Sequence, residues 1–491
     1  MIRFNSNIFS QIKGAYIIGG SIRDLLLDRI PTDYDIAVTG DLKKNAEKIA
    51  KNISGRLFKM GKPGQMIIRV VSNDNIIDIN SLNGSFIEDD LRKRDFTINA
   101  MAYDLSSGEI IDCLGGLGDL VNKKIRMVSA DVFKKDPIRL IRAYRIGACL
   151  NFQIESQTAS SINADAKLIE NSAGERIRSE IFKLLGTPKS YHYLSQMDDA
   201  GLLTAIFPDL DRLKECLQNN HHMYDVFEHT MKAYQHLETI LNDPAKTLPD
   251  TSIRIRQYLD EEKTVLLKYA ILLHDIGKPW AKTIDSRGKI HFYGHPRKSA
   301  DLAQKVSQKL KFSNFEKRFV DFIIRNHLNP LFLFTAMQKK TLTHKGVTRF
   351  FIKCGDNAPA LLLHTLADTL AKRDTTDQAN KAFICFVTDM IRNFFCDYNC
   401  KIKEPPLITG RDLIHEFGLI PSPLFKTILN LVQEERLTGT IKSRSEAING
   451  IFWPPAVFSL VFNPRNSALC LRLKTPSGLA GNQNLPFLDV H

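Results

Sequence analysis

The chain has 491 residues, of which 43% are hydrophobic and 25% charged, a composition typical of ordinary soluble proteins rather than of disordered or membrane-embedded ones. No apolar run approaches a membrane span, the N-terminus lacks the apolar core of a secretory signal, and the eight cysteines are scattered, which together favour a reducing cytoplasm. The formal net charge of +13 favours a polyanionic partner, and a chain of this length is expected to form roughly three or four domains.

The first predicted elements are a short buried strand, Ala15–Ile18, and a helix, Ile22–Leu27. Between them, Gly19 and Gly20 allow a tight turn and close approach of a ligand to the backbone, and Ser21 is expected to cap the helix. The free N–H groups of such a helix favour a triphosphate as the ligand.

A second predicted strand, Asp33–Val38, carries two carboxylates. Because side chains alternate along a strand, Asp33 and Asp35 point to the same face, where they are suited to a divalent metal. The order of strand, Gly-Gly-Ser, helix with Arg23, and strand with Asp-x-Asp resembles the nucleotidyltransferase signature of class II tRNA CCA-adding enzymes and bacterial poly(A) polymerases. The resemblance implies that the two aspartates hold Mg²⁺ for phosphoryl transfer, and that Gly20 and Arg23 contact the incoming nucleotide.

A helix, Leu42–Asn52, and two further strands, Gln65–Val71 and Ile76–Ile79, are expected to complete a small helix-flanked sheet. Asp78 on the last strand could supply a third carboxylate, but a solvated edge residue fits the pattern equally well. We therefore leave Asp78 outside the predicted site.

The stretch Glu88–Met101 would form a helix with a charged outer face if it were purely structural. It resembles the family's Arg-Arg-Asp-Phe-Thr-Ile-Asn-Ala-Met motif, with Lys93 in place of the first arginine. The resemblance implies that Arg94, Asp95 and Asn99 contact sugar and phosphate, with Arg94 neutralising the triphosphate.

The head is expected to close with the segment Ile110–Asp119, which resembles the family's Asp-x-x-Gly-Gly-x-x-Asp-Leu element. A neck helix is then predicted to begin at Asp136, with proline in its first turn. Arg139, Arg142 and Arg145 recur every three residues, so they form one basic stripe, for which an exposed, ion-paired helix would be the usual interpretation. The resemblance to the family implies instead that they contact the nucleotide.

The start of the neck helix resembles the family's Glu-Asp-x-x-Arg element, with Lys135 in place of glutamate, in which Asp and Arg read the base as a protein template. Cytosine and adenine both present an amine beside an unprotonated ring nitrogen, so the acceptor Asp136 and the donor Arg139 can pair with either base. Uracil and guanine would leave both side chains unpaired, which a site built to hydrogen-bond rejects by roughly 10⁴-fold. CTP and ATP are therefore the expected substrates.

After another family element at Gly174–Glu180, the pattern changes to histidines and aspartates in the order found in the HD phosphohydrolase superfamily: His229, His274, Asp275, His295, His327 and Asp368. One such histidine is more often a packed or surface residue, but six such residues in this order favour a metal site. Nitrogen and carboxylate ligands suit Mn, Ni, Fe, Co or Mg better than a structural zinc, and such sites activate water against a phosphoester.

The resemblance covers roughly residues 14–450 and implies an α+β fold, in which a polymerase-β-like nucleotidyltransferase head with a mixed sheet and helices precedes all-α domains. In the family, the helical tail grips the tRNA elbow. The expected domains are the head (1–125), a neck that reads the base and binds RNA (126–208), an HD phosphohydrolase-like domain (209–400), the tRNA-binding tail (401–450) and an unassigned extension (451–491).

The sequence thus predicts a cytoplasmic, template-independent tRNA nucleotidyltransferase that completes the CCA end, binds the tRNA acceptor stem and elbow, and uses CTP and ATP. Mg²⁺ is expected in the head, and a divalent transition metal or Mg²⁺ at the HD site. Poly(A) polymerases and enzymes adding only CC or only A are the nearest alternatives, and the short segment between Asp78 and Arg92 is typical of CC-adding relatives.

Two other classes remain open. A regulatory protein uridylyltransferase also joins such a head to an HD domain, although no sensing repeats follow here. A non-enzymatic RNA-binding scaffold would not need both sets of site residues. No membrane partner is expected, and the oligomeric state is left open.

Overall fold

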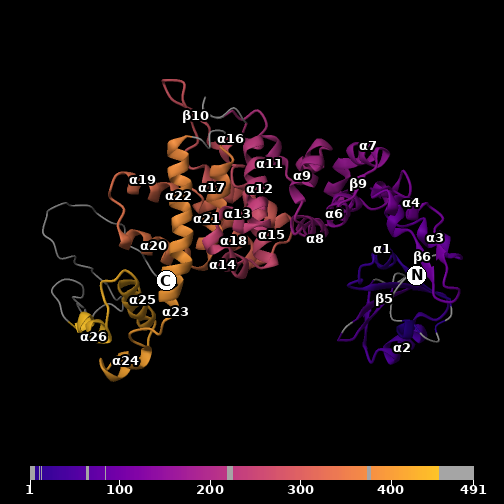
Figure 1. Cartoon of the computed structure of the whole chain (residues 1–491), viewed down its shortest axis with the longest axis horizontal. Coiled ribbons are helices and arrows are strands. Elements are labelled where there is room, and N and C mark those ends of the chain that lie inside the picture. Colours follow the sequence, from indigo (N-terminus) through magenta and orange to yellow (C-terminus); the bar gives the residue numbers. More distant parts are fainter. Residues whose placement is uncertain are drawn as a thin grey trace, which may run out of the picture. The chain divides into compact units, whose positions relative to one another are not determined.

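A strand-rich N-terminal part is followed by a long helical part in the computed structural model of the chain (Figure 1). The described residues are 6–9, 12, 14–61, 66–73, 75–82, 84–217, 225–372 and 377–452. Gln65, at the start of one predicted strand, and residues 453–491 of the unassigned extension lie outside them. The chain divides into two compact units, residues 1–335 with 356–392, and residues 336–355 with 393–491.

Seven strands form the head sheet in the order β3-β4-β5-β2-β1-β6-β7. Their bounds are Ala15–Ile18 (β1), Tyr34–Val38 (β2), Arg56–Met60 (β3), Ile67–Val71 (β4), Ile76–Ser81 (β5), Ala102–Asp104 (β6) and Ile110–Ile111 (β7). β2 and β5 are parallel, whereas the other neighbouring pairs are antiparallel. The mixed sheet predicted for the head is therefore confirmed, with β3, β6 and β7 added to it.

Three α-helices and a 3₁₀ turn accompany the sheet: α1 (Gly20–Leu26), α2 (Leu42–Asn52), α3 (Ile87–Leu91) and Thr97–Asn99. The predicted bounds of α2 are confirmed, and the side chain of Asp41 caps the helix by accepting from the Lys44 N–H. No continuous helix spans residues 88–101, because α3 ends at Leu91 and the 3₁₀ turn begins only at Thr97. Asp95 accepts a hydrogen bond from the Phe96 N–H at 2.8 Å, and such local side-chain bonds compete with helix formation.

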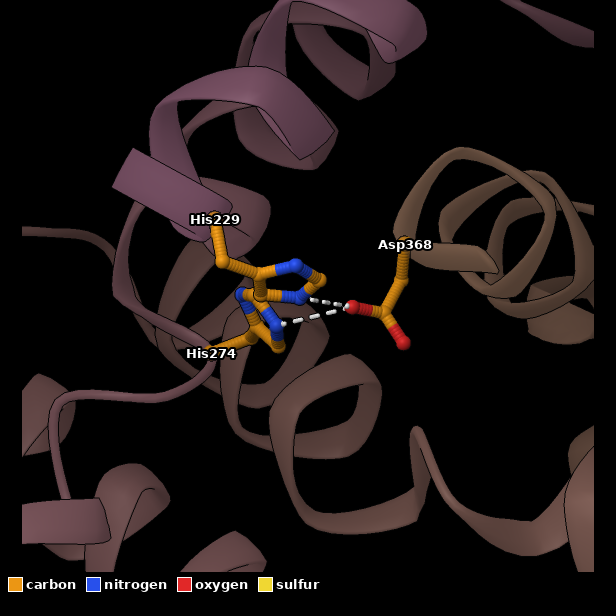
Figure 2. Close-up of side chains that lie close together, drawn as sticks. All are labelled: His229, His274 and Asp368. Atoms are coloured by element: carbon orange, nitrogen blue, oxygen red, sulfur yellow. Dashed lines mark hydrogen bonds and ion pairs between the residues drawn. The ribbon is translucent and has the colours of Figure 1, made fainter. Parts of the chain in front are cut away.

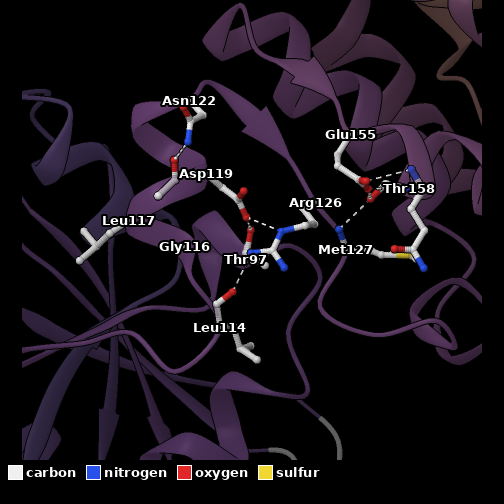
Figure 3. A network of polar contacts seen from close by, with 12 residues as sticks. Thr97, Leu114, Gly116, Leu117, Asp119, Asn122, Arg126, Met127, Glu155 and Thr158 are labelled. Atoms are coloured by element: carbon white, nitrogen blue, oxygen red, sulfur yellow. Dashed lines mark hydrogen bonds and ion pairs between the residues drawn. The ribbon is translucent and has the colours of Figure 1, made fainter.

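The closing element of the head is fixed by a buried polar network, shown in Figure 3. Asp119, on α4 (Gly116–Val121), accepts from the Thr97 hydroxyl at 2.6 Å and from Arg126 Nε at 2.7 Å. Gly116 packs so closely that a Cβ there would lie 2.4 Å from the Thr97 carbonyl oxygen. The glycines and the aspartate of this element therefore anchor the segment that carries Asn99.

Helices dominate the rest of the first unit. Its neck helices are α5 (Val132–Lys135), α6 (Arg139–Leu150), α7 (Ser156–Asp165), α8 (Gly174–Leu185), α9 (Ser190–Asp199), α10 (Leu202–Ile206) and α11 (Pro208–Asp211). Further along follow α12 (Val226–Asn242), α13 (Pro244–Thr247), α14 (Ser252–Tyr258), α15 (Glu261–Leu273), α16 (Lys278–Ala281), α17 (His295–Lys309), α18 (Asn314–Asn326), α19 (Asn329–Gln338), α21 (Ala358–Leu370) and α22 (Gln378–Asn393).

Two short ladders interrupt this helical part: β8 (Lys124–Ile125) with β9 (Gln153–Ile154), and β10 (Thr283–Ile284) with β11 (Ile290–His291). α15 and α21 form the centre of the HD region, and every residue of Val265–Leu273 in α15 is buried. The run is apolar apart from Lys268, which pairs with Glu238 at 3.0 Å, and a helix of this kind is buried on all sides. These two helices therefore bring the ligands at their ends into the protein interior.

The second unit contains α20 (His344–Cys354), a π-helical turn (Phe394–Tyr398), α23 (Asn399–Lys403), α24 (Gly410–His415), α25 (Leu424–Leu437) and α26 (Arg444–Phe452). Ile408, Leu413, Val432 and Ala447 form its small tail core. Within the described part of the chain, no helix is both long enough and apolar enough to cross a bilayer.

Candidate functional site

The Gly-Gly turn lies directly against the aspartate strand. Gly19 has a φ of 72°, which favours glycine, and it precedes α1. A Cβ at this position would lie 2.9 Å from Asp35 Oδ2 and 2.7 Å from Arg94 Nη1. Only glycine leaves room for a carboxylate, a guanidinium and a ligand at this turn.

Ser21 does not cap the helix as predicted. α1 begins at Gly20, and its N-cap Gly19 offers no side chain. The Ser21 hydroxyl instead donates to the Asp33 carbonyl oxygen at 3.1 Å and accepts from the Asp35 N–H at 2.8 Å. Ser21 therefore fixes the backbone on which both carboxylates are carried.

A third carboxylate faces the same way. Asp35 and Asp78 are direct neighbours across the parallel strands β2 and β5, so their side chains share a face. Asp78 lies on a central strand and is bound by Arg69 through two bonds of 2.7 Å, so the solvated-edge interpretation is wrong.

The environment of Asp35 favours a cation. Burial raises the pKa of Asp35 to about 6, Arg94 opposes this rise, and the negative charges of Asp33 and Asp78 add to it. Carboxylates gathered in this way are relieved by a hard divalent ion with oxygen ligands. The residues present therefore fit Mg²⁺.

Four predicted nucleotide contacts from three distant segments form one chain of two hydrogen bonds and an ion pair. Arg23 Nη1 donates to Asn99 Oδ1 at 2.7 Å, and Asn99 Nδ2 donates to Asp95 Oδ1 at 3.0 Å. Arg142 Nε lies 2.8 Å from Asp95 Oδ2. Burial alone would raise the pKa of Asp95, but the charge of Arg142 and these hydrogen bonds outweigh it and lower that pKa. The chain is thus an ionised, pre-positioned set of donors and acceptors.

The motif around Arg94 is also connected to the neck. Arg94 pairs with Asp90 at 3.0 Å. Arg139 donates to the backbone carbonyl oxygens of Lys93 at 2.9 Å and of Arg94 at 3.3 Å. The predicted base-reading arginine is therefore held beside the predicted phosphate-binding arginine.

Asp136 lies outside the neck helix. The helix predicted to begin at Asp136 begins at Arg139, and Asp136 has an extended backbone with a φ of −150°. The reason is local, because a residue that precedes a proline, here Pro137, is disfavoured in the α region.

The family element Gly174–Glu180 on α8 holds two of the predicted contacts. Arg176 forms a forked ion pair with Asp136, with distances of 2.8 and 3.0 Å. Glu180 accepts from Arg145 Nε at 2.9 Å. Two arginines of the predicted basic stripe, Arg142 and Arg145, are therefore paired with carboxylates, whereas Arg139 is bonded to backbone carbonyl oxygens. Sequence reasoning missed Arg176, whose only signal was its place in that element.

All six predicted HD ligands come together in one buried cluster. Figure 2 shows His229 and His274 pointing at Asp368, with Nε2 to Oδ1 distances of 2.8 and 3.3 Å. Asp275 lies 3.2 Å from His274 Nε2 and 3.3 Å from His295 Nε2. His295 and His327 face each other with 3.2 Å between their Nε2 atoms.

The hydrogen bonds of three histidines show which ring nitrogen of each could bind a metal. The Nδ1 atoms of His274, His295 and His327 lie 2.7 to 2.8 Å from backbone carbonyl oxygens, so each Nδ1 must carry a proton. Their Nε2 lone pairs are thereby directed into one shared space, the arrangement typical of metal-bound imidazoles.

Charge balance in the cluster also calls for a cation. Burial alone would lower the pKa of His274, but Asp275 and Asp368 outweigh it and raise that pKa to about 10. Burial lowers the pKa of His327 to about 3, with the charge of His274 adding to the effect. A bound divalent ion would replace the proton that His274 holds between two carboxylates, so the donor set fits a metal.

The structure adds two residues that sequence reasoning missed. His364 is fully buried one turn before Asp368 on α21, and its ring centroid lies 5.0 Å from that of His274. Neither of its ring nitrogens has a hydrogen-bond partner among the described residues. Lys278 lies 2.6 Å from Asp275. The i, i+4 spacing of His364 and Asp368 was a usable signal, whereas Lys278 offered none.

Three parts of the chain match known protein families. Residues 15–86 and 78–126 match the poly(A) polymerase head domain. Residues 151–214 match the probable RNA and SrmB-binding site of polymerase A, and residues 226–344 match the HD domain.

Curated relatives resemble most of the chain. An A-adding tRNA nucleotidyltransferase of Deinococcus radiodurans is 30% identical over 442 residues, covering 88% of this chain and 94% of that protein. A CC-adding tRNA nucleotidyltransferase of Thermus thermophilus is 27% identical over 449 residues, covering 89% and 93%. A CC-adding tRNA nucleotidyltransferase of Geobacter sulfurreducens is 39% identical over 195 residues, covering 40% and 45%.

Solved structures share the fold. A CCA-adding enzyme in complex with ATP superposes with a TM-score of 0.59 at 20% identity, covering 89% of each chain. The Thermotoga maritima CCA-adding enzyme complexed with tRNA gives a TM-score of 0.54 at 20% identity, covering 89% of this chain and 90% of the other.

Proposed function

The chain belongs to the family of tRNA nucleotidyltransferases and poly(A) polymerases, and from that premise we propose that it adds CMP and AMP to the tRNA 3′ end without a nucleic-acid template. The observation that carries the proposal is the head site. Asp35 adjoins the Gly19 turn and Arg94, and Ser21 fixes the backbone of Asp33 and Asp35. The chain Arg23, Asn99, Asp95, Arg142 connects the head to the neck. We also propose that the domains have the limits predicted from the sequence.

In this proposal, Asp33 and Asp35 hold Mg²⁺, which when bound supplies charge stabilisation to the reacting phosphate. Arg94 and Arg23 neutralise the triphosphate, and the Gly19 turn lets the backbone approach it. Their carboxylate and amide partners keep both guanidinium groups in place before the nucleotide arrives.

We propose that two residues of the neck select the base of the incoming nucleotide. Asp136 accepts from the exocyclic amine of cytosine or adenine, and Arg139 donates to the neighbouring ring nitrogen. Arg139 donates to the carbonyl oxygens of residues 93 and 94, and its remaining N–H groups are available to the base. We also propose that the partner is tRNA, and that the neck binds its acceptor stem and the tail binds its elbow.

The direct test uses purified protein, Mg²⁺ and tRNAs that end before the first C, before the second C, or before the final A. Each tRNA is incubated with one nucleotide at a time. We expect CMP on the first two and AMP on the third, with UTP and GTP rejected. Incorporation of UTP at the rate of CTP would contradict the assigned base-reading site.

A CC-adding enzyme is the second candidate, because one observation favours it. β5 ends at Ser81 and α3 begins at Ile87, so only residues 82–86 connect them. Asp136 and Arg139 must shift to accommodate a purine, and a connection this short has little reach to move them. A tRNA ending in CC and offered ATP decides the question, because efficient extension by one A removes the CC-only alternative.

We further propose that the HD cluster is a metal-dependent phosphohydrolase centre. His229, His274, Asp275, His295, His327 and Asp368 would hold a transition metal or Mg²⁺, which when bound polarises water and the phosphoester. Lys278 beside Asp275 supplies a fixed positive charge for a phosphate oxygen. Hydrolysis of a phosphomonoester or a 2′,3′-cyclic phosphate, measured with each metal in turn, tests this function.

A further inference from the structure

The segment between two HD ligands borders the metal centre at both of its ends. It leaves the cluster after Asp275 and returns at His295, and it consists of α16 and the β10–β11 hairpin (Figure 1). The Nδ1 atom of His295 lies 2.8 Å from the carbonyl oxygen of Phe292, so the second half of the hairpin is tied to a ligand. A ligand held at either end of this segment is therefore close to the HD cluster.

Tyr293 forms an aromatic platform on the hairpin. Its side chain is 77% exposed, and its ring stacks on His291 with a centroid distance of 5.0 Å and an interplanar angle of 10°. His291 is itself held by Asp285, with Nε2 2.9 Å from Oδ2. One face of the tyrosine is thus backed by a fixed ring, and its exposure leaves the other face for a planar ligand.

A second exposed aromatic side chain carries cations. Trp280, at the end of α16, is 50% exposed, and Arg212 Cζ lies 4.6 Å from its ring centroid. Lys298 Nζ lies 5.3 Å from the same ring. Cation–π contacts of this kind hold long basic side chains at a surface while keeping their charge available.

The surroundings are strongly basic. Lys282, Arg287, Lys289, Arg297 and Lys298 are all exposed, and Asp285 is the one acidic residue in the sequence 276–298. That aspartate is held by His291, and its single negative charge is outnumbered by the five basic side chains. Exposed aromatic rings interleaved with basic groups are the features by which proteins bind single-stranded nucleic acid.

We propose that this segment, residues 276–298 with Arg212, binds the end of a single-stranded RNA and presents its terminal phosphoester to the HD centre. A base stacks on Tyr293, and the basic side chains contact the phosphates. The inference rests on the proposed HD function and names its substrate class. A purely solvated hairpin would have no need of two large exposed aromatic rings beside a metal cluster.

Trp280 is a built-in reporter of binding. The chain has two tryptophans, Trp280 and Trp453, so the substitution Trp453→Phe leaves Trp280 as the single indole. The probe is the trinucleotide CCA with a 3′-phosphate, added to the full chain without divalent metal so that binding is measured without turnover. Saturable fluorescence quenching is expected with the trinucleotide and not with inorganic phosphate.

Substitutions at the platform separate stacking from charge. Tyr293→Ala is expected to weaken trinucleotide binding by about tenfold, whereas Tyr293→Phe keeps the ring and the affinity within about twofold. Lys282→Ala is expected to reduce the salt dependence of binding, because one phosphate contact is lost. Lys43→Ala, at an exposed lysine of α2, is the matched control and is expected to change neither value.

Three results would overturn the proposal. Equal affinity of the parent and Tyr293→Ala, with matching thermal midpoints, would show that no base stacks there. Equal quenching by inorganic phosphate would show a site for phosphate only. Nucleotide addition to tRNA is also measured for Tyr293→Ala, because unchanged addition shows that the head still functions in this variant. A raised KM for tRNA in that assay would show that the hairpin binds tRNA for nucleotide addition, and would overturn the proposal. Absence of nucleotide addition by the parent enzyme would refute only the proposed transferase activity.

Discussion

Arg176 is expected to set the fidelity of base reading through Asp136. The two side chains are 52% and 28% exposed, and exposed pairs contribute about 0 to 1 kcal/mol to stability, so Arg176→Ala is expected to fold normally. Its forked contact, at 2.8 and 3.0 Å, fixes the direction of the carboxylate that accepts from the base amine. Losing that orientation is expected to cost about 1.4 kcal/mol of discrimination, which is about tenfold in the preference for CTP over UTP.

The assay measures kcat/KM for CTP and for UTP on the same tRNA lacking its CCA end. Arg176→Lys keeps the charge without the planar fork, so it is expected to behave like Arg176→Ala. Lys214→Ala removes an ion pair with Asp198 of the neck helix α9, at 2.8 Å, and serves as the matched control with unchanged preference.

A double-mutant cycle decides whether Arg176 acts through Asp136. Asp136→Ala alone is expected to lose most discrimination, and adding Arg176→Ala to it should change little more. Additive losses, or full discrimination in Arg176→Ala, would refute the positioning role.

Three further outcomes are expected. Because burial raises the pKa of Asp35 to about 6, a proton must leave before Mg²⁺ binds below that pH, so the apparent Mg²⁺ affinity in nucleotide addition should fall as the pH drops from about 7 to about 5; a flat profile would contradict this. His274→Ala and Asp275→Ala should lose bound metal by elemental analysis and lose phosphoesterase activity while keeping nucleotide addition, and retained metal would refute the ligand assignment. Gly116→Ala should lower the free energy of unfolding by about 1 to 3 kcal/mol in denaturant titrations, since its Cβ would meet a carbonyl oxygen at 2.4 Å, whereas Gly118→Ala, with open space around its Cβ, should be neutral or stabilising by about 0.5 kcal/mol; equal effects would refute the packing argument.

Local patterns in the sequence were sufficient for the elements on either side of the aspartate strand, whereas that strand, predicted from Asp33, begins at Tyr34. The apolar run Ala15–Ile18 and the amphipathic period of Leu42–Asn52 predicted β1 and α2 with their observed bounds. The exposed strand β3 was missed, because all five of its residues are exposed and no alternation of burial marks it. Resemblance, rather than periodicity, predicted which polar residues would gather in the head.

Long-range contacts between side chains could not be predicted from the sequence. A serine after two glycines can cap a helix or bond across the turn, and only the fold places the Ser21 hydroxyl between Asp33 and Asp35. The pairing of Arg176 with Asp136 spans 40 positions along the chain. His364 was not among the predicted ligands, and only the approach of α21 to the other ligand-bearing helices shows its ring beside that of His274.

The central claim is that Asp33 and Asp35 form the metal-binding centre of a tRNA nucleotidyltransferase. Incorporation of labelled CMP into tRNA lacking its CCA end, compared between the parent, Asp33→Ala and Asp35→Ala at matched thermal midpoints, tests it most directly. We predict robust incorporation by the parent and essentially none by either variant, because each loses a carboxylate that holds Mg²⁺. Near-parental incorporation by either variant, or none by the parent with any nucleotide, would contradict the account.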